Sequence, residues 1–327
     1  MFKHLKLKIE GTIMLILVIS SIIISITSYI ALKFFITNNF ISLASNSFSQ
    51  SIDNVSTHMK LIQESSNLLM ENNTVLEVLR TNDYNTDITS VLNLPKNSYS
   101  GILGVVLINS YGNEYLSESV SYYPSLTVLR YNKDINNFIS SKKNSFWFIR
   151  DNYTAEYYNR NIYDEKLGVI TFMTKIFDKN KKMLGFLCID IDPNYLYSLF
   201  LDNNSGFINN SRIYISIDTI KILSHRNEDY LDNYLKKEIS LKSNPKYWID
   251  YKNKFLLLYD NLFYNNKAIL AIPLTLLYNK LKNLLILLLI INLIIIALAF
   301  LMGNAISNSI CKPLIKLYNK MKKSYFN

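Results

Sequence analysis

The sequence predicts an α+β fold in which two transmembrane helices flank a long stalk helix and two tandem modules built on antiparallel sheets. Three observations lead to this prediction. Long apolar segments without charge lie near both ends of the chain, and a helical pattern without proline or glycine follows the first of them. The region between holds two successive groups of short apolar, β-branched runs separated by polar turn residues, which is typical of strands.

The two apolar segments, residues 12–36 and 284–302, are each long enough to cross a bilayer. No charged residue lies between Glu10 and Lys33, and none lies within 284–302. About 20 apolar residues cross the hydrocarbon core as a helix, because the backbone must pair its own polar groups there. The first segment exceeds the apolar region of a signal peptide and ends in large residues, so we expect an uncleaved anchor.

The charge distribution predicts the topology. The formal net charge is +10, yet residues 37–283 hold 26 Lys or Arg against 24 Asp or Glu, so the excess lies on the two short tails. Because positive flanks stay inside, residues 1–11 and 303–327 are expected in the cytoplasm and 37–283 outside it, in a multi-pass protein of a bacterial cell membrane. The basic pI of 9.2 therefore needs no nucleic-acid partner.

The two cysteines also bear on this topology. Cys188 falls in the outer region and Cys311 in the cytoplasmic tail, so an intrachain disulfide is excluded. The outer region must therefore be held together by its apolar core.

The stalk helix is predicted over residues 37–80. Its apolar residues recur at intervals of 4, 3, 4, 3 and 7, with Ser66 at the one missing place, which is a heptad seam. This seam either packs on the chain's own outer domain or forms a homodimer interface, and the pattern leaves both alternatives open. The seam residues are Phe48, Ile52, Val55, Met59, Ile62 and Leu69.

The two modules are predicted at about 95–200 and about 205–275. In the first, strands are expected at Gly101–Asn109, Gly168–Ile176 and Met183–Ile191, with a short helix from Pro193 to Phe200. A turn at residues 110–113 and a second short strand are expected to complete a hairpin with the first strand, and about 50 residues of mixed character separate this hairpin from the next strand. In the second, strands are expected at 212–217, 220–224, 247–251, 254–259 and 268–272, with a helix over 229–239.

Two of these runs carry a family resemblance. The stretch from Lys175 to Asp192 resembles the last hairpin of the membrane-distal module of double Cache (dCache) sensor domains, and Ala268–Pro273 resembles the closing strand of their proximal module. The resemblance implies two PAS-like modules placed outside the cell. It also implies a sensor that detects a small molecule or peptide.

The C-terminal residues resemble another signalling element. Residues 306–317 contain the pattern "I-x-x-P-L-x-x-L" at 310–317, and Met-Lys-Lys follows at 321–323. This stretch is similar to the first helix of a HAMP linker and closest to YesM-type sensor histidine kinases. Pro313 is expected near the start of that helix. Apolar residues spaced 4, 3 and 4 apart predict a coiled-coil seam that would relay the signal. The alternative is an amphipathic helix on the membrane surface. The seam residues are Ile310, Leu314, Leu317 and Met321.

The resemblance also assigns ligand-binding positions. In dCache domains that bind amino acids, an arginine two residues before a Trp-aromatic pair holds the carboxylate, and a later aspartate holds the amino group. Trp147-Phe148 and Asp190 match this pattern, but Ser145 stands where the arginine should be, so amino-acid binding is in doubt. The alternatives are core packing of the two aromatics and a structural role for Asp190 near the end of its strand.

Four further residues complete the candidate binding set. Tyr122, Tyr123, Arg130 and Arg150 lie in the same region of the sequence, where apolar walls with a few polar groups would form a pocket. Surface positions for the two arginines are the alternative.

No catalytic constellation is visible, so we expect no enzyme activity in this chain, and no metal or cofactor. The three histidines, His4, His58 and His225, are isolated and expected in solvent. The resemblance implies the sensing half of a two-component histidine kinase, which would reach a response regulator only through a kinase region outside this chain. The alternatives are a chemotaxis receptor, a diguanylate cyclase receptor or a stand-alone membrane-anchored binding protein.

Overall fold

The structure, a computed structural model, describes residues 2–81, 86–150, 157–158, 168–201, 211–217, 221–224 and 247–325. It divides into two compact units. One combines Met1–Leu43 with Leu274–Asn327, and the other is Ala44–Pro273. The predicted helix over 229–239 and His225 lie outside the described residues.

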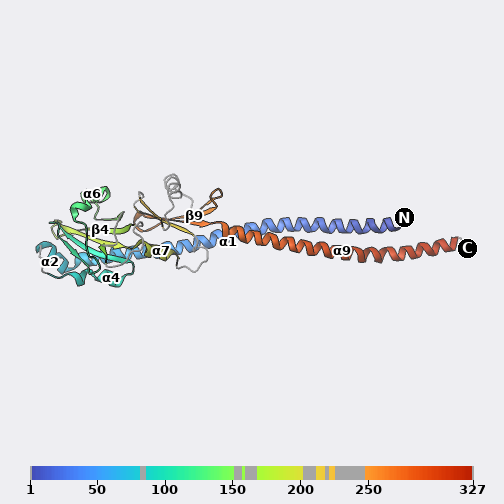
Figure 1. Cartoon of the computed structure of the whole chain (residues 1–327), viewed down its shortest axis with the longest axis horizontal. Coiled ribbons are helices and arrows are strands. Elements are labelled where there is room, and N and C mark those ends of the chain that lie inside the picture. Colours follow the sequence, from blue (N-terminus) through green and yellow to red (C-terminus); the bar gives the residue numbers. More distant parts are fainter. Residues whose placement is uncertain are drawn as a thin grey trace. The chain divides into compact units, whose positions relative to one another are not determined.

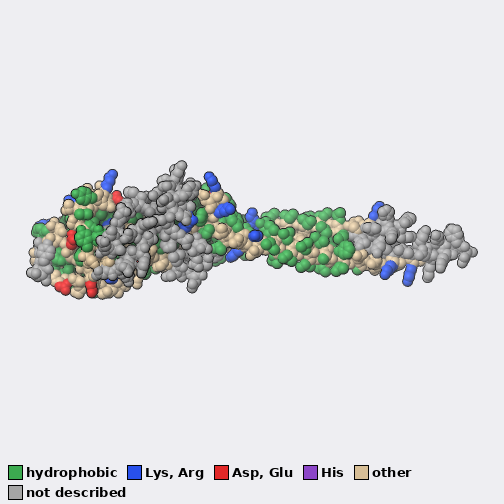
Figure 2. Space-filling model, viewed as in Figure 1, with side chains coloured by type: hydrophobic (Ala, Val, Ile, Leu, Met, Phe, Trp, Pro, Cys, Tyr) green, Lys and Arg blue, Asp and Glu red, His purple; other side chains and the backbone are tan. Residues whose placement is uncertain are grey.

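The first unit is built from the N-terminal part of one long helix, α1 (Phe2–Glu71), up to Leu43, and from a second long helix, α9 (Thr275–Tyr325) (Figure 1). Both are long and apolar enough to cross a membrane, over Met14–Glu71 and Thr275–Ile310, and only 6% of the most apolar window of each is buried. Figure 2 shows hydrophobic side chains covering this part of the molecule. Pro313 lies inside α9, so its prediction near a helix start was wrong. The helix simply continues from the apolar segment instead of restarting.

Within the second unit, α1 carries the predicted heptad seam. All six seam residues from Phe48 to Leu69 are buried, and Ser66 between them is fully buried too. The seam therefore packs on the chain's own domain, as the first alternative predicted. The helix ends at Glu71, earlier than expected, because the Asn72 side chain accepts hydrogen bonds from the backbone N–H groups of Thr74 (2.9 Å) and Val75 (3.3 Å) and caps α2 (Asn73–Thr81).

The distal module is a five-stranded antiparallel sheet with the order β2-β1-β5-β4-β3. In the described chain, four helices of four to eight residues lie before and between the strands of this sheet, and the nine-residue helix α7 follows the last strand. The strands are β1 (Ile102–Asn109), β2 (Glu114–Leu116), β3 (Ser145–Arg150), β4 (Val169–Phe177) and β5 (Met183–Ile191). The helices are α3 (Thr89–Leu92), α4 (Leu94–Ser98), α5 (Leu126–Leu129), α6 (Lys133–Ser140) and α7 (Pro193–Leu201).

The two faces of the distal sheet have different partners. On one face, Phe146, Phe148, Met173, Phe186 and Cys188 form a core cluster with side chains from α5, α6 and the preceding loop. On the other face, the Thr174 hydroxyl donates to Met70 Sδ on α1 at 3.6 Å. Because side chains alternate along a strand, neighbouring residues of β3 belong to different faces.

The proximal module repeats the plan. Its five strands follow the order β7-β6-β10-β9-β8. If the strands of each sheet are counted from one in chain order, both sheets have the order 2-1-5-4-3. A 3₁₀ turn, η2 (Phe263–Asn265), precedes the last strand. The strands are β6 (Arg212–Ile217), β7 (Lys221–Ser224), β8 (Tyr247–Asp250), β9 (Phe255–Asn261) and β10 (Lys267–Pro273).

The predicted strands of both modules are confirmed, most to within one residue of their ends, and a mixed helical and antiparallel fold with a long N-terminal helix is confirmed with them. β3, α5 and α6 were not predicted from the sequence, because they lie in the stretch of mixed character between the first hairpin and β4. Their apolar residues are few and interrupted: α6 buries only Ile135 and Phe138, so periodicity gives little signal.

Candidate functional site

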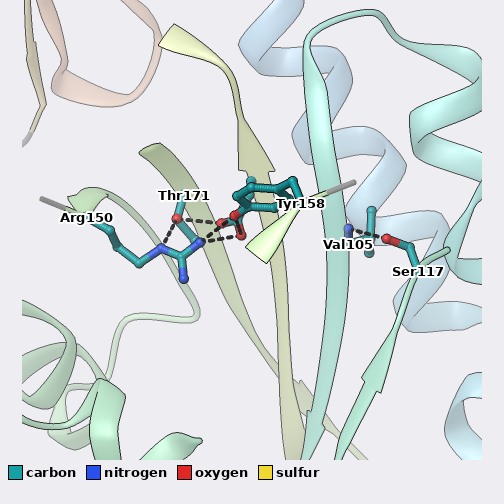
Figure 3. Close-up of polar contacts among 6 residues, drawn as sticks. Val105, Ser117, Arg150, Tyr158 and Thr171 are labelled. Atoms are coloured by element: carbon teal, nitrogen blue, oxygen red, sulfur yellow. Dashed lines mark hydrogen bonds and ion pairs between the residues drawn. The ribbon is translucent and has the colours of Figure 1, made fainter. Parts of the chain in front are cut away.

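A buried polar network lies on the clustered face of the distal sheet (Figure 3). Asp190 on β5 accepts hydrogen bonds from the hydroxyls of Thr171 (2.6 Å) and Tyr158 (2.5 Å) and forms an ion pair with the Arg150 guanidinium. Arg150 Nε also donates to the Thr171 hydroxyl at 2.9 Å, and its Nη2 lies 3.1 Å from the Tyr158 hydroxyl. All four side chains are buried.

The register of the strands brings these residues together. Thr171 on β4 lies directly opposite Asp190 on β5. Arg150, the last residue of β3, pairs with Val169, two residues before Thr171, so its long side chain reaches Thr171 along the same face. Tyr158 forms an isolated antiparallel β-bridge with Val120. The network thus joins strands β3, β4 and β5 to Tyr158.

The network is electrically balanced. A buried carboxylate is unfavourable unless it is paired and hydrogen-bonded, and Asp190 has a guanidinium and two hydroxyl donors. The Arg150 guanidinium carbon lies 4.7 Å from the centre of the Tyr123 ring, which adds a cation–π contact. The positive and negative charges therefore compensate each other without a bound ion.

Cys188 lies two residues before Asp190 on the same face. Burial, and secondarily the Asp190 charge, raises the pKa of its thiol to about 12. A thiol with so high a pKa carries almost no thiolate at neutral pH. Cys188 is therefore a buried, protonated thiol that packs within the apolar cluster of this face.

A second buried cation lies elsewhere on this face. Lys175 Nζ donates to the Ser141 carbonyl oxygen at 2.5 Å and lies 4.9 Å from the centre of the Phe138 ring. Burial lowers the pKa of this amine. The face therefore holds polar groups at two places within an otherwise apolar cluster.

The structure brings together four of the seven predicted binding residues. Tyr123, Phe148, Arg150 and Asp190 lie on the network face, whereas the Trp147 ring lies on the opposite face, 4.8 Å from the Phe172 ring. The surface alternative for Arg150 was wrong, because the guanidinium is needed inside as the partner of Asp190.

The remaining predicted residues lie at the surface. Tyr122 is 54% exposed and stacks on Tyr157 with ring centres 5.2 Å apart, and Arg130 is exposed at the end of α5. On α9, Ile310 and Leu317 are exposed, and the helix also includes Leu314 and Met321.

Two network members, Thr171 and Tyr158, were not predicted. Thr171 could have been found, because it and Asp190 are polar residues in mostly apolar strands that a hairpin pairs. Tyr158 lies in a tyrosine-rich stretch without periodicity, and only the folded chain brings it to Asp190.

His58 was predicted to be solvated, and this was wrong. Its side chain is buried on α1, and its ring lies 5.0 Å from the Tyr195 ring of α7. Burial lowers its pKa. The heptad seam accounts for this position, since His58 directly precedes the seam residue Met59.

A separate cavity of about 400 Å³ lies between α1 and the other face of the distal sheet. Gln63 and Asn67 line it from α1, and Phe172 and Thr174 line it from β4. At its rim, the Ser145 hydroxyl lies 3.1 Å from the hydroxyl of Tyr264, which belongs to the proximal module. Across the part of the chain that the structure describes, no group of three His, Cys, Asp or Glu side chains is placed to hold a metal ion.

Comparison with known proteins gives a fold but no family. No family model matches the chain. No curated protein matches it either. The extracellular domain of vpHK1S-Z8, assigned as a histidine kinase, is similar with a TM-score of 0.52 and 11% identity, over 72% of this chain and 93% of that domain. The ligand-binding domain of Mlp24, solved with asparagine, is similar with a TM-score of 0.51 and 12% identity, over 76% of this chain and 99% of that domain.

A third similar structure is larger than this chain. An extracellular ligand-binding receptor from Desulfohalobium retbaense has a TM-score of 0.47 and 9% identity, over 69% of this chain, and the match spans only 39% of that receptor. Identities this low show the fold alone. The fold of the described chain is similar to that of the extracellular domain of vpHK1S-Z8 and the ligand-binding domain of Mlp24.

Proposed function

We propose that this chain is the sensing part of a bacterial membrane receptor. The apolar segments of α1 and α9 cross the membrane, and residues 37–283 lie outside the cytoplasm and bind a ligand. One observation carries the proposal: a two-module fold of the extracellular sensor type lies between two helices apolar enough to cross a membrane. The lysines on both tails support cytoplasmic termini.

The distal module is the proposed ligand-binding region. Its clustered face combines aromatic side chains with the Arg150–Asp190 network, and Tyr122 stands exposed beside it. The Mlp24 domain was solved with asparagine. Here the carboxylate that would hold an amino group is already paired with Arg150, and Ser145 cannot hold a carboxylate as an arginine does. These features favour a small molecule or peptide that is not held through an α-amino group on Asp190.

The proposed output is a histidine kinase reached through the end of α9. Two features support it: the motif around Pro313 and Leu314, and the unbroken helix from Thr275 to Tyr325, which could transmit a displacement. A chemotaxis receptor is the second candidate, because the same fold occurs in chemoreceptors.

A thermal-shift screen of the detergent-solubilised chain tests ligand binding directly. A compound that binds only the folded state at 100 times its Kd stabilises it by about 2.7 kcal/mol. We expect at least one hit among organic acids, sugars, purines and short peptides. The stabilisation by that compound should be smaller in Tyr122→Ala, which alters an exposed residue beside the network face. It should be unchanged in Trp147→Phe, which alters the opposite face. A folded chain that no compound stabilises would contradict direct small-molecule sensing.

A further inference from the structure

Three polar side chains face one another within the apolar segments of α1 and α9. The Ser21 hydroxyl donates to Asn292 Oδ1 at 2.5 Å, and Asn292 Nδ2 donates to the Ser25 hydroxyl at 2.7 Å. Nδ2 also donates to the Leu288 carbonyl oxygen at 2.9 Å within α9. The Asn292 amide thus has partners at both of its polar atoms, and two of its three hydrogen bonds cross between the helices.

The neighbouring hydroxyls behave differently. Ser20 donates to the Leu17 carbonyl oxygen (2.9 Å), and Thr27 donates to the carbonyl oxygens of Ile23 and Ile24, all within α1. Ser21 is buried, whereas its neighbours Ser20 and Ile22 are exposed. Ser21 and Ser25 are four residues apart and so share one face of α1. The contact is therefore specific to one face of each helix.

The contact lies on the seam along which α9 packs against α1. The positions of α9 that are at least half-buried recur every three or four residues through Leu288, Asn292 and Ile296 to Ala299 and Gly303. The last two are small, and small residues let helices approach closely in membranes. Asn292 is the polar position in the middle of an otherwise apolar stretch of this seam.

We propose that Asn292 is a positioning residue whose hydrogen bonds to Ser21 and Ser25 fix the axial register of α9 against α1. This inference rests on the proposed function, because it requires both helices to lie in the membrane. There, an amide without partners is costly, since no water replaces a lost bond. Sliding α9 by one turn moves Asn292 about 5.4 Å and breaks both crossing bonds. Movement of α9 relative to α1 therefore occurs between discrete registers and not continuously.

Cysteine cross-linking of the full chain in bacterial membranes tests the register. Cys188 and Cys311 are replaced by alanine and serine. One cysteine is then placed at Val18, and a second either at Ile296, one turn from Asn292 along the seam, or at Phe300, one turn further. The yield at 296 divided by the yield at 300 measures how strongly one register is preferred.

We expect this ratio to fall about 3- to 10-fold in Asn292→Leu and to fall in Ser21→Ala, in line with measured energies of interhelical hydrogen bonds. Ser20→Ala is the matched control and should leave the ratio unchanged. Exchanging the pair, Ser21→Asn with Asn292→Ser, should restore it, which a loss of general packing would not do. An unchanged ratio in Asn292→Leu overturns the inference.

Two other outcomes would also overturn it. If the cross-linked product has twice the mass of the chain, the seam joins two copies and not the two helices of one chain. If alkaline carbonate releases the chain from the membrane fraction, the proposed membrane receptor fails and the inference fails with it. This last result is distinguishable, because it appears without any cross-linking.

Discussion

Removing the positive charge from the distal network should destabilise the outer unit strongly. In Arg150→Met the Asp190 carboxylate remains fully buried and keeps only the hydroxyls of Thr171 and Tyr158. Breaking a buried ion pair on one side costs about 3–5 kcal/mol, out of a total stability of about 5–15 kcal/mol. For a domain of about 150–250 residues each kcal/mol is worth about 2–4 °C, so the melting temperature should fall by about 6–20 °C.

The matched variants separate the charge effect from general damage. Arg130→Met removes an exposed arginine and should change stability by less than about 0.5 kcal/mol. Adding Asp190→Asn to Arg150→Met removes the uncompensated charge and should recover at least about 2 kcal/mol, because neutral replacement of a buried pair is often tolerated. Urea unfolding followed by circular dichroism gives these values. If Arg150→Met is as mild as Arg130→Met, the buried pair as described is wrong.

Three further predictions concern titration, thiol chemistry and turn strain. Because burial lowers the pKa of His58, the unfolded chain binds its proton more readily; stability from this group is complete above about pH 6.5 and falls as the pH drops below that value. In His58→Phe the melting temperature should depend less on pH between pH 5 and 7. An unchanged pH dependence would show that another group titrates. In a Cys311→Ser chain, Cys188 should resist a thiol reagent at pH 8 until denaturant is added, since its pKa is about 12 and it is buried; rapid labelling of the folded chain would contradict this. Lys181 has a φ of 63° in the turn between β4 and β5, so Lys181→Gly should stabilise by about 0.5–1 kcal/mol in urea unfolding, and Lys182→Gly should not.

Local pattern predicted the strands and the buried seam but not the chemistry of the distal face. A strand such as Met183–Ile191 shows itself as a continuous apolar run, and both of its boundaries were predicted. The pairing of Arg150 with Asp190 spans 40 residues and depends on strand order, which no local pattern contains. The face on which the Trp147 side chain lies also depends on the register of β3. A shift of the strand by one residue would move every side chain to the opposite face of the sheet.

The hydrogen bonds of Asn292 show the same limit in the long helices. An asparagine in an apolar segment is visible in the sequence, but its partners Ser21 and Ser25 lie about 270 residues earlier. Only the antiparallel packing of α1 and α9 selects them from the several hydroxyls of α1.

Labelling of cysteines from outside the cell tests the proposed topology of the chain. In a chain with Cys188→Ala and Cys311→Ser, a single cysteine replaces either Lys182, exposed in the turn between β4 and β5, or Lys316, exposed on α9 beyond the apolar segment. Intact cells, with the outer envelope permeabilised where there is one, are treated with a membrane-impermeant maleimide. We expect labelling of Lys182→Cys in intact cells and labelling of Lys316→Cys only after lysis. Protection of Lys182→Cys in intact cells, with labelling after lysis, would contradict an extracytoplasmic sensor.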